Sequence, residues 1–119
     1  MDIVKDFSFE SAHLLPNLPE SHKCRRLHGH SFRVEVRVSG PVDETLAWVC
    51  DFAEITDIVR PIIEDELDHR YLNEIKGLEN PTSESIAIWL WRRIKPSLPG
   101  LSEIVVHETC TARAVYRGD

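Results

Sequence analysis

The sequence has no apolar run long enough to cross a membrane, since none approaches the roughly 18 consecutive apolar residues that suggest a transmembrane helix. Its amino terminus, MDIVKDFSFE, carries acidic residues where a secretory signal has a basic end and a long apolar stretch. Cysteine occurs only three times, and an odd number argues for reduced thiols and against a disulfide framework. We therefore expect a cytoplasmic protein with no membrane partner.

Basic residues are also scarce: 14 lysines and arginines face 20 aspartates and glutamates, which gives a net charge of −6. This balance disfavours a nucleic-acid partner, because a phosphate backbone needs a basic surface. A small anion can still bind where Lys23, Arg25 and Arg26 cluster, since a short-range field depends on nearby charges. Hydrophobic residues at 42% and charged residues at 29% are ordinary for a globular protein, and the length predicts a single domain over residues 1–119.

The pattern of polar and apolar residues predicts both strands and helices. Strict alternation predicts four strands, over residues 3–13, 28–39, 102–109 and 112–118. Helical spacing predicts one helix over residues 53–67, with a kink or restart at Pro61. Thr82 is a good N-cap for a second helix that should end near Lys95. This order favours an α+β fold, with a four-stranded antiparallel sheet and two helices on one face.

A small open sheet of this kind has two free edges, and each edge presents unpaired backbone N–H and C=O groups. A monomer must hide those groups, whereas an oligomer can pair them. We therefore expect a homo-oligomer in which the sheets continue from subunit to subunit.

The segment HKCRRLHGHSF, residues 22–32, concentrates three histidines and a cysteine. On a strand, His28 and His30 point the same way, so both imidazoles can reach one metal ion. The alternative is a pair of hydrogen-bonded or surface histidines. His13, at the end of the neighbouring strand, is the best-placed third ligand, although a histidine at the edge of the core fits the pattern equally well. Three histidines with no fourth protein ligand would leave an open position, as in catalytic zinc sites.

Other candidates for proton transfer or substrate binding are Cys24, Asp68, His69 and Glu108. The basic neighbours of Cys24 favour its thiolate, so it is a base or nucleophile, a fourth zinc ligand, or an inert thiol. Asp68 beside His69 could tune a proton carrier, although a polar helix end explains the pair as simply. Glu108 is predicted on the apolar side of its strand, where a carboxylate is either paired or awaits a ligand. His107 is predicted on the exposed face and receives no role.

These residues lie in motifs that resemble the 6-pyruvoyltetrahydropterin synthase superfamily, and within it the bacterial 6-carboxytetrahydropterin synthases of queuosine biosynthesis. The matching motifs span the chain: FSFESAH, CRRLHGHSF, DFAEI, LDHRYLN, NPTSE and ETCTA. The spacing from Cys24 to His28 is similar to that of the carboxy-forming branch. Arg25 stands where relatives often have glycine, and AHLL stands where AHRL is common.

The resemblance implies a tunnelling fold (T-fold), in which the sheets of three subunits close into a barrel and two trimers stack into a hexamer with sites between subunits. It also implies a set of site residues: Zn²⁺ on His13, His28 and His30, Cys24 as proton acceptor, Asp68 with His69 as a relay, and Glu108 as the anchor of the pterin ring.

On this basis we expect a zinc-dependent lyase that converts 7,8-dihydroneopterin triphosphate to 6-carboxy-5,6,7,8-tetrahydropterin, with release of acetaldehyde and triphosphate. Lys23, Arg25 and Arg26 are candidate contacts for the triphosphate because of their clustering alone. One alternative is a 6-pyruvoyltetrahydropterin synthase, which eliminates triphosphate but keeps all side-chain carbons. A second is a non-catalytic zinc-binding oligomer, which would need none of the proton-transfer candidates.

Overall fold

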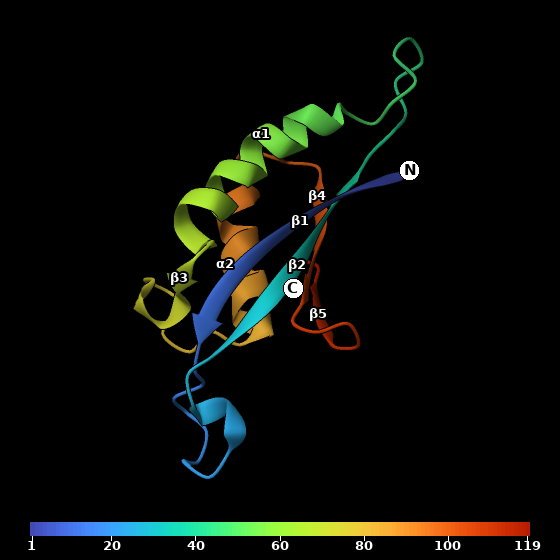
Figure 1. Ribbon diagram of the computed structural model, residues 1–119. Helices are drawn as coiled ribbons and strands as arrows, with labels where there is room; N and C mark the ends of the chain where they lie inside the picture. Colours follow the sequence, from blue (N-terminus) through green and yellow to red (C-terminus); the bar gives the residue numbers. More distant parts are fainter.

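The computed structural model describes all 119 residues and contains one five-stranded sheet with two α-helices on one of its faces (Figure 1). The strand order across the sheet is β3-β1-β2-β4-β5. The strands are β1 (Asp2–His13), β2 (His28–Ser39), β3 (Arg70–Tyr71), β4 (Leu101–His107) and β5 (Arg113–Tyr116), and the helices are α1 (Phe52–Ile62) and α2 (Ser83–Ile94). Neither helix is long and apolar enough to cross a membrane.

The long pair of strands β1 and β2 positions the candidate site. They pair antiparallel over their full lengths, with His13 directly opposite His28. Because side chains alternate along a strand, Phe9 and Phe32 both point into the core under the helices, where their rings stack with centroids 4.9 Å apart. The imidazoles of His13 and His30 pack edge-on against the Phe32 ring, so the histidines continue the core-facing side of the sheet.

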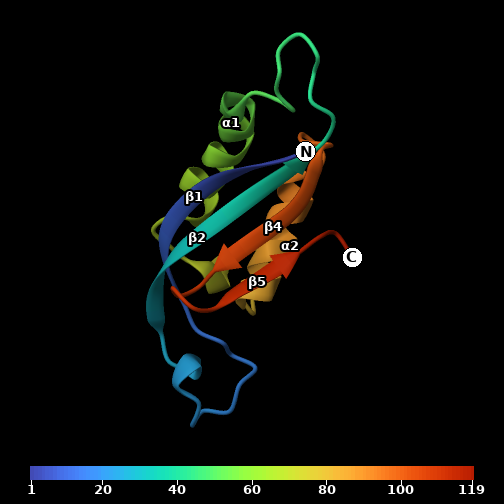
Figure 2. The same cartoon turned by 90° about the vertical axis from the view of Figure 1, so that its right-hand side faces the viewer.

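The sheet differs from the predicted one in its outermost strand. β3, labelled in Figure 1, pairs in parallel with Ser11–Ala12 of β1, so the sheet has five strands and is not wholly antiparallel. Figure 2 shows the other strands, β1, β2, β4 and β5, side by side. A strand of two residues is too short to show an alternating pattern. The four predicted strands and the two helices on one face are confirmed, whereas closure into a barrel across subunits stays a prediction.

The predicted single helix over residues 53–67 changes its winding near its end. α1 ends at Ile62, one residue after Pro61, and the chain continues as a π-helical segment, Ile63–Leu67. Proline removes one N–H from the regular helical ladder, which favours a change of winding nearby. The wider turn closes with a 2.8 Å hydrogen bond from the N–H of Asp68 to the carbonyl of Ile63, and it delivers Asp68 to the outer edge of β1.

Asp51→Ala is expected to lower the free energy of unfolding by about 1 kcal/mol. The reason is that Asp51 Oδ1 accepts a 2.9 Å hydrogen bond from the backbone N–H of Ala53 and so caps α1. Asp57→Ala, an exposed substitution within the same helix, is the matched control and should be close to neutral. Urea denaturation of both variants measures the difference, and equal losses would contradict a capping role for Asp51.

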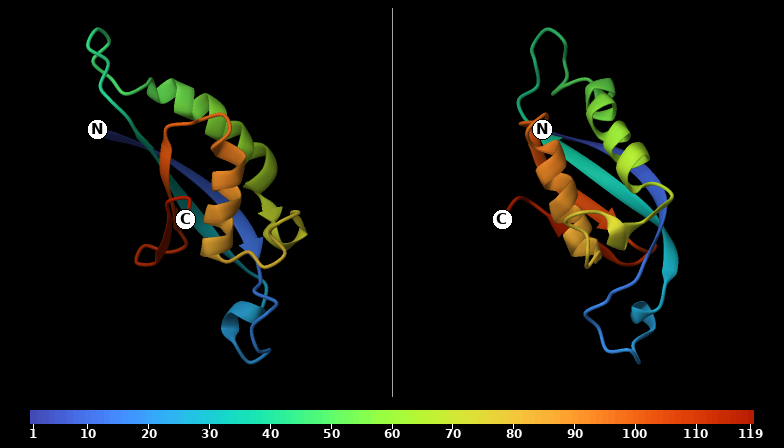
Figure 3. Two further views of the ribbon diagram at one scale, coloured as in Figure 1. Left: turned by 180° about the vertical axis from the view of Figure 1, so that it is seen from behind. Right: turned by 90° about the vertical axis from the view of Figure 1, so that its left-hand side faces the viewer.

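Two loops project from opposite ends of the sheet, residues 14–27 after β1 and residues 40–51 after β2 (Figure 3). The first loop carries the basic cluster, and its base is closed by a 2.8 Å hydrogen bond from the N–H of Leu15 to the carbonyl of Cys24.

As predicted, Thr82 caps α2, since its Oγ1 accepts a 3.1 Å hydrogen bond from the N–H of Ser85.

Candidate active site

Three imidazoles converge where β1 ends and β2 begins. Each of His13, His28 and His30 offers one ligand atom, and these atoms all lie within 4.8 Å of one another. The ring centroids are 4.6 Å apart for His13 and His28, 5.1 Å for His13 and His30, and 4.9 Å for His28 and His30. The strand register produces this cluster, because it sets His13 opposite His28 and places His30 two residues further along the same face.

Backbone carbonyls orient two of the three rings. His13 Nδ1 lies 2.8 Å from the carbonyl oxygen of Pro81, and His28 Nδ1 lies 2.7 Å from that of Arg26. A carbonyl only accepts, so each Nδ1 donates its proton and leaves the lone pair on Nε2. The Nε2 atoms of His13 and His30 are buried with no hydrogen-bond partner. A divalent metal would satisfy these nitrogens, so the donor set fits the predicted zinc.

Burial keeps two of the imidazoles neutral. Desolvation lowers the pKa of His13 and the pKa of His30 below that of a free histidine, because the imidazolium form is costly away from water. The nearby carboxylate of Glu108 acts in the opposite direction on both groups without reversing the shift. A neutral imidazole is the form that binds a metal ion.

In the metal-free protein, the free energy of unfolding is expected to fall as the pH is lowered from about 7 to about 5. An unfolded histidine has a pKa of about 6.5, and the pKa of His13 and of His30 is lower than this in the folded protein. The unfolded chain therefore takes up protons first, and the stability present above pH 6.5 is lost as the pH falls through the folded-state pKa. Urea titrations after chelation measure this slope, which should be shallower in His13→Asn; an equal slope would contradict the assignment.

Glu108 joins the histidines to a neighbouring hollow. Its Oε1 lies 3.6 Å from Nε2 of His13 and 3.5 Å from Nε2 of His30. The hollow has a volume of about 310 Å³ and is lined by Leu15, Thr82, Ser83, Glu84, Glu108, Ala112, Arg113 and Ala114. Glu84, in the first turn of α2, gives it a second carboxylate that the sequence reasoning missed; only its place in the NPTSE motif marked it. A ligand in this hollow can therefore meet two carboxylates and point toward the imidazoles.

Asp68 and His69 form the predicted pair but lie apart from this cluster. His69 Nδ1 is 2.8 Å from Asp68 Oδ2. Hydrogen bonds from the backbone N–H of Glu10 and then from His69 lower the pKa of Asp68, so its carboxylate stays ionised. His69 is largely exposed and lines an open hollow with Glu10, Gly29 and Ser31, and also with Ser11 and His30. The pair is held at the outer edge of β1 and lies outside the group of ligand atoms formed by the three histidines.

The loop after β1 carries the remaining predicted residues. Cys24 lies in a short 3₁₀ turn, Lys23–Arg25, and is partly buried, but it is not part of the ligand group of the three histidines. Arg25 donates from Nε to the carbonyl of Pro16 at 3.1 Å, which ties it to the loop. Lys23 and Arg26 are exposed and form no ion pair within the chain. The side chains of Lys23 and Arg26 are therefore free to bind an anion, and the backbone carbonyl of Arg26 connects this loop to the histidine cluster through His28.

His107 lies on the helix-free face of the sheet, as predicted, but the prediction that it is exposed there is wrong. It is only 8% exposed, because Glu35 and Arg33 of β2 cover it on the helix-free face of the sheet. Its Nε2 lies 2.5 Å from Glu35 Oε2, and its Nδ1 lies 3.4 Å from Arg33 Nη2. Long charged side chains on an outer sheet face can bury one another, which alternation alone does not reveal.

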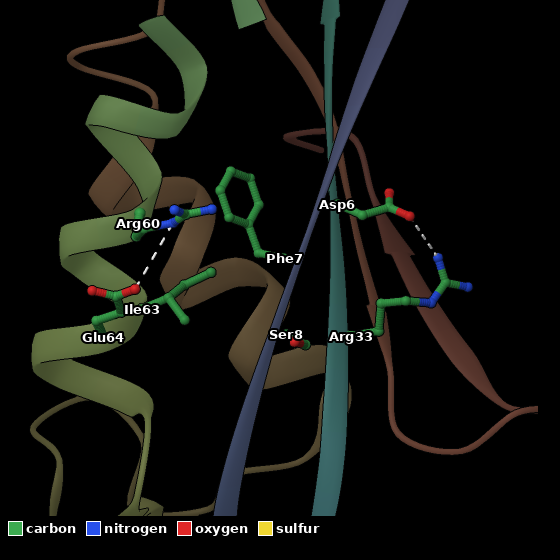
Figure 4. A pocket seen from close by; sticks show the side chains of 7 residues that line it. All are labelled: Asp6, Phe7, Ser8, Arg33, Arg60, Ile63 and Glu64. Carbon is green, nitrogen blue, oxygen red and sulfur yellow. Dashed lines mark hydrogen bonds and ion pairs between the residues drawn. The ribbon is translucent and has the colours of Figure 1, made fainter. Parts of the chain in front are cut away.

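A hollow of about 360 Å³ lies across the free edge of β1, and Figure 4 shows the side chains on both sides of the strand. Its cations are already paired: Arg33 Nη1 lies 3.2 Å from Asp6 Oδ2, and Arg60 Nε lies 3.8 Å from Glu64 Oε1. Its arginines are therefore poor candidates for the triphosphate. Apart from the short contact with β3, this edge of β1 has no strand partner in the chain.

Comparisons with known proteins agree with the motifs. The family model described as 6-pyruvoyl tetrahydropterin synthase matches residues 2–119. The chain is 45% identical to the 6-carboxy-5,6,7,8-tetrahydropterin synthase of Synechocystis sp., over 96% of this chain and 91% of that protein. It is 39% identical to the dihydroneopterin monophosphate aldolase of Pyrococcus furiosus, over 82% of this chain and 78% of that one. The structure of Caenorhabditis elegans 6-pyruvoyl tetrahydropterin synthase matches with a TM-score of 0.90 at 26% identity, over 100% of this chain and 96% of that one.

Proposed function

The chain belongs to the 6-pyruvoyl tetrahydropterin synthase family, and from this premise we propose that it converts 7,8-dihydroneopterin triphosphate and water to 6-carboxy-5,6,7,8-tetrahydropterin, acetaldehyde and triphosphate. Such an activity would serve queuosine biosynthesis. The observation that carries the proposal is the cluster of His13, His28 and His30 beside Glu108, in a chain 45% identical to a named 6-carboxy-5,6,7,8-tetrahydropterin synthase. A metal-storage oligomer would not need the adjoining carboxylate-lined hollow.

The hollow beside Glu108 is the proposed place for the pterin ring. Zinc held by the three imidazoles supplies Lewis acidity to the hydroxyl groups of the substrate's side chain. Glu108 accepts hydrogen bonds from the amide edge of the ring, and Glu84 offers a second acceptor in the same hollow. The ring is thereby oriented with its side chain toward the histidines, which supplies proximity.

Proton transfer falls to Cys24 and His69. Cys24 is the proposed base that removes a proton from a side-chain carbon of the substrate. His69, whose Nδ1 is paired with Asp68, would exchange a second proton at a side-chain oxygen through Nε2. Lys23, Arg25 and Arg26 are the proposed contacts of the triphosphate, although Arg25 must share its guanidinium with the carbonyl of Pro16.

A complete site then requires more than one copy of the chain. Asp68 and His69 are held at the outer edge of β1 and lie outside the group of ligand atoms formed by the three histidines. The relay of one subunit would therefore act at the histidine cluster of another. This agrees with the proposed barrel and hexamer, in which the free edge of β1 and the outer edge of β5 find partners.

Analysis of the products of the zinc-loaded protein with 7,8-dihydroneopterin triphosphate tests the proposal. We expect acetaldehyde and triphosphate in equal amounts. Triphosphate without acetaldehyde would instead indicate a pyruvoyl-forming enzyme. An aldolase would cut between the first two side-chain carbons and release a phosphorylated glycolaldehyde. Either result would overturn the proposed reaction while leaving the family membership intact.

A further inference from the structure

The dipeptide Glu10–Ser11 of β1 holds the four-residue segment from Leu67 to Arg70 through four hydrogen bonds, two of them to Asp68 and His69. The N–H of Glu10 donates to Asp68 Oδ1 at 2.9 Å, and the carbonyl of Glu10 accepts from the N–H of His69 at 2.6 Å. The hydroxyl of Ser11 donates to the carbonyl of Leu67, and the same oxygen accepts from the N–H of Arg70 at 3.4 Å. Glu10 thus binds the centre of this segment and Ser11 binds its two ends, and together they clamp it to β1.

The Ser11 hydroxyl closes the turn from Leu67 to Arg70. In many turns of four residues, the first carbonyl accepts directly from the fourth N–H. Here no backbone hydrogen bond joins Leu67 to Arg70, and both groups meet Ser11 Oγ instead. Ser11 is only 7% exposed, so water does not readily replace it. Without this hydroxyl, a carbonyl and an N–H at the turn would lose their partner.

The turn also holds His69 in an unfavourable backbone conformation. Its φ is 55°, in the left-handed region that residues with a Cβ rarely adopt. The His69 side chain is 79% exposed, so packing cannot fix its ring. Its position depends on the backbone contacts to Glu10, on the bond to Asp68 and on the closure of the turn by Ser11. Such a conformation persists only where its surroundings over-determine it.

We propose that Ser11 is a positioning residue, whose buried hydroxyl fixes the Asp68–His69 turn to the strand that carries His13. Ser11 is also paired with His30 across the β1–β2 register, so the clamp sets the relay of each subunit relative to its own metal ligands. This inference rests on the proposed role of Asp68 and His69 as a proton relay. It assigns to Ser11 no contact with the substrate.

Ser11→Ala in the zinc-loaded protein is expected to lower kcat about 10- to 100-fold, since a misplaced general acid or base loses its geometry. KM for 7,8-dihydroneopterin triphosphate and the zinc content should stay at wild-type values. Ser11→Thr keeps the hydroxyl and should restore most of the lost kcat. Ser8→Ala is the matched control, because Ser8 is an exposed serine of the same strand whose hydroxyl forms no hydrogen bond.

Nitrogen NMR of the His69 ring gives a readout that does not depend on turnover. In the wild type, Nδ1 bears the proton shared with Asp68, and in Ser11→Ala the other tautomer should appear. An unchanged spectrum or a wild-type kcat in Ser11→Ala would overturn the inference. A joint loss of kcat, zinc and folding in Ser11→Ala that Ser11→Thr does not reverse would overturn it as well. If Ser11→Ala does not fold, Ser11→Cys is judged by the same readouts. If no pterin is turned over, the spectrum alone decides, and a changed spectrum upholds the clamp while the proposed function fails.

Discussion

A one-to-one mixture of Cys24→Ala and His69→Ala subunits is expected to recover about a quarter of wild-type activity, although each variant alone is nearly inactive. The proposed site takes Cys24 from one subunit and His69 from another. In randomly mixed oligomers, half of the sites receive an intact Cys24 and, independently, half receive an intact His69. The product of these two fractions is the expected quarter. If one chain supplied both residues to a site, no mixed oligomer would contain an intact site.

The mixture is best made by co-expressing the two chains with different tags and isolating the oligomers that carry both. A mixture of Asp68→Ala with His69→Ala is the matched control and should recover nothing, because both defects lie in the same subunit's relay. Cys24→Ala mixed with Asp68→Ala should recover activity as the first pair does. Failure of both complementing pairs would contradict a site shared between subunits.

His30→Gln is expected to lose bound zinc and to reduce kcat/KM by about a thousandfold or more, since a lost Lewis acid costs several kcal/mol of transition-state stabilisation. His30 Nε2 is buried without a hydrogen-bond partner and lies beside the other two imidazoles and 3.5 Å from Glu108 Oε1, so a metal ion would satisfy it. The glutamine amide cannot replace the imidazole as a strong zinc ligand. Metal analysis after gel filtration, together with steady-state kinetics, measures both losses.

His107→Gln is the control for that variant. His107 is also a buried histidine, but its nitrogens are engaged by Glu35 and Arg33, and the glutamine amide can still donate to Glu35. This variant should keep its zinc. Equal zinc contents in His30→Gln and the wild type would contradict the three-histidine site.

The sequence predicted the pair of His28 and His30 from strand geometry and offered His13 as a candidate third ligand. A period of two sets His28 and His30 on one face, and His13 ends the strand that pairs with them. The pattern could not decide whether His13 was a ligand or a core residue, since that depends on the register. The resemblance to a family supplied the third ligand, and the structure brings the three rings together.

The parts that the sequence could not predict depend on contacts between distant segments. β3 has only two residues, and its pairing with β1 follows from the π-helical turn and the clamp at Ser11. The left-handed backbone of His69 breaks the usual preference of its residue type, as strained conformations at functional sites often do. The burial of His107 comes from charged neighbours on an adjacent strand, which no local pattern reports.

X-ray absorption at the zinc edge of the purified oligomer tests the central claim most directly, because it identifies the atoms around the metal. The account predicts three nitrogen ligands at about 2.0 to 2.1 Å and one oxygen from water or substrate. A sulfur ligand at about 2.3 Å would place Cys24 on the metal and remove it as the base. That result, or the absence of zinc from the active protein, would contradict the account.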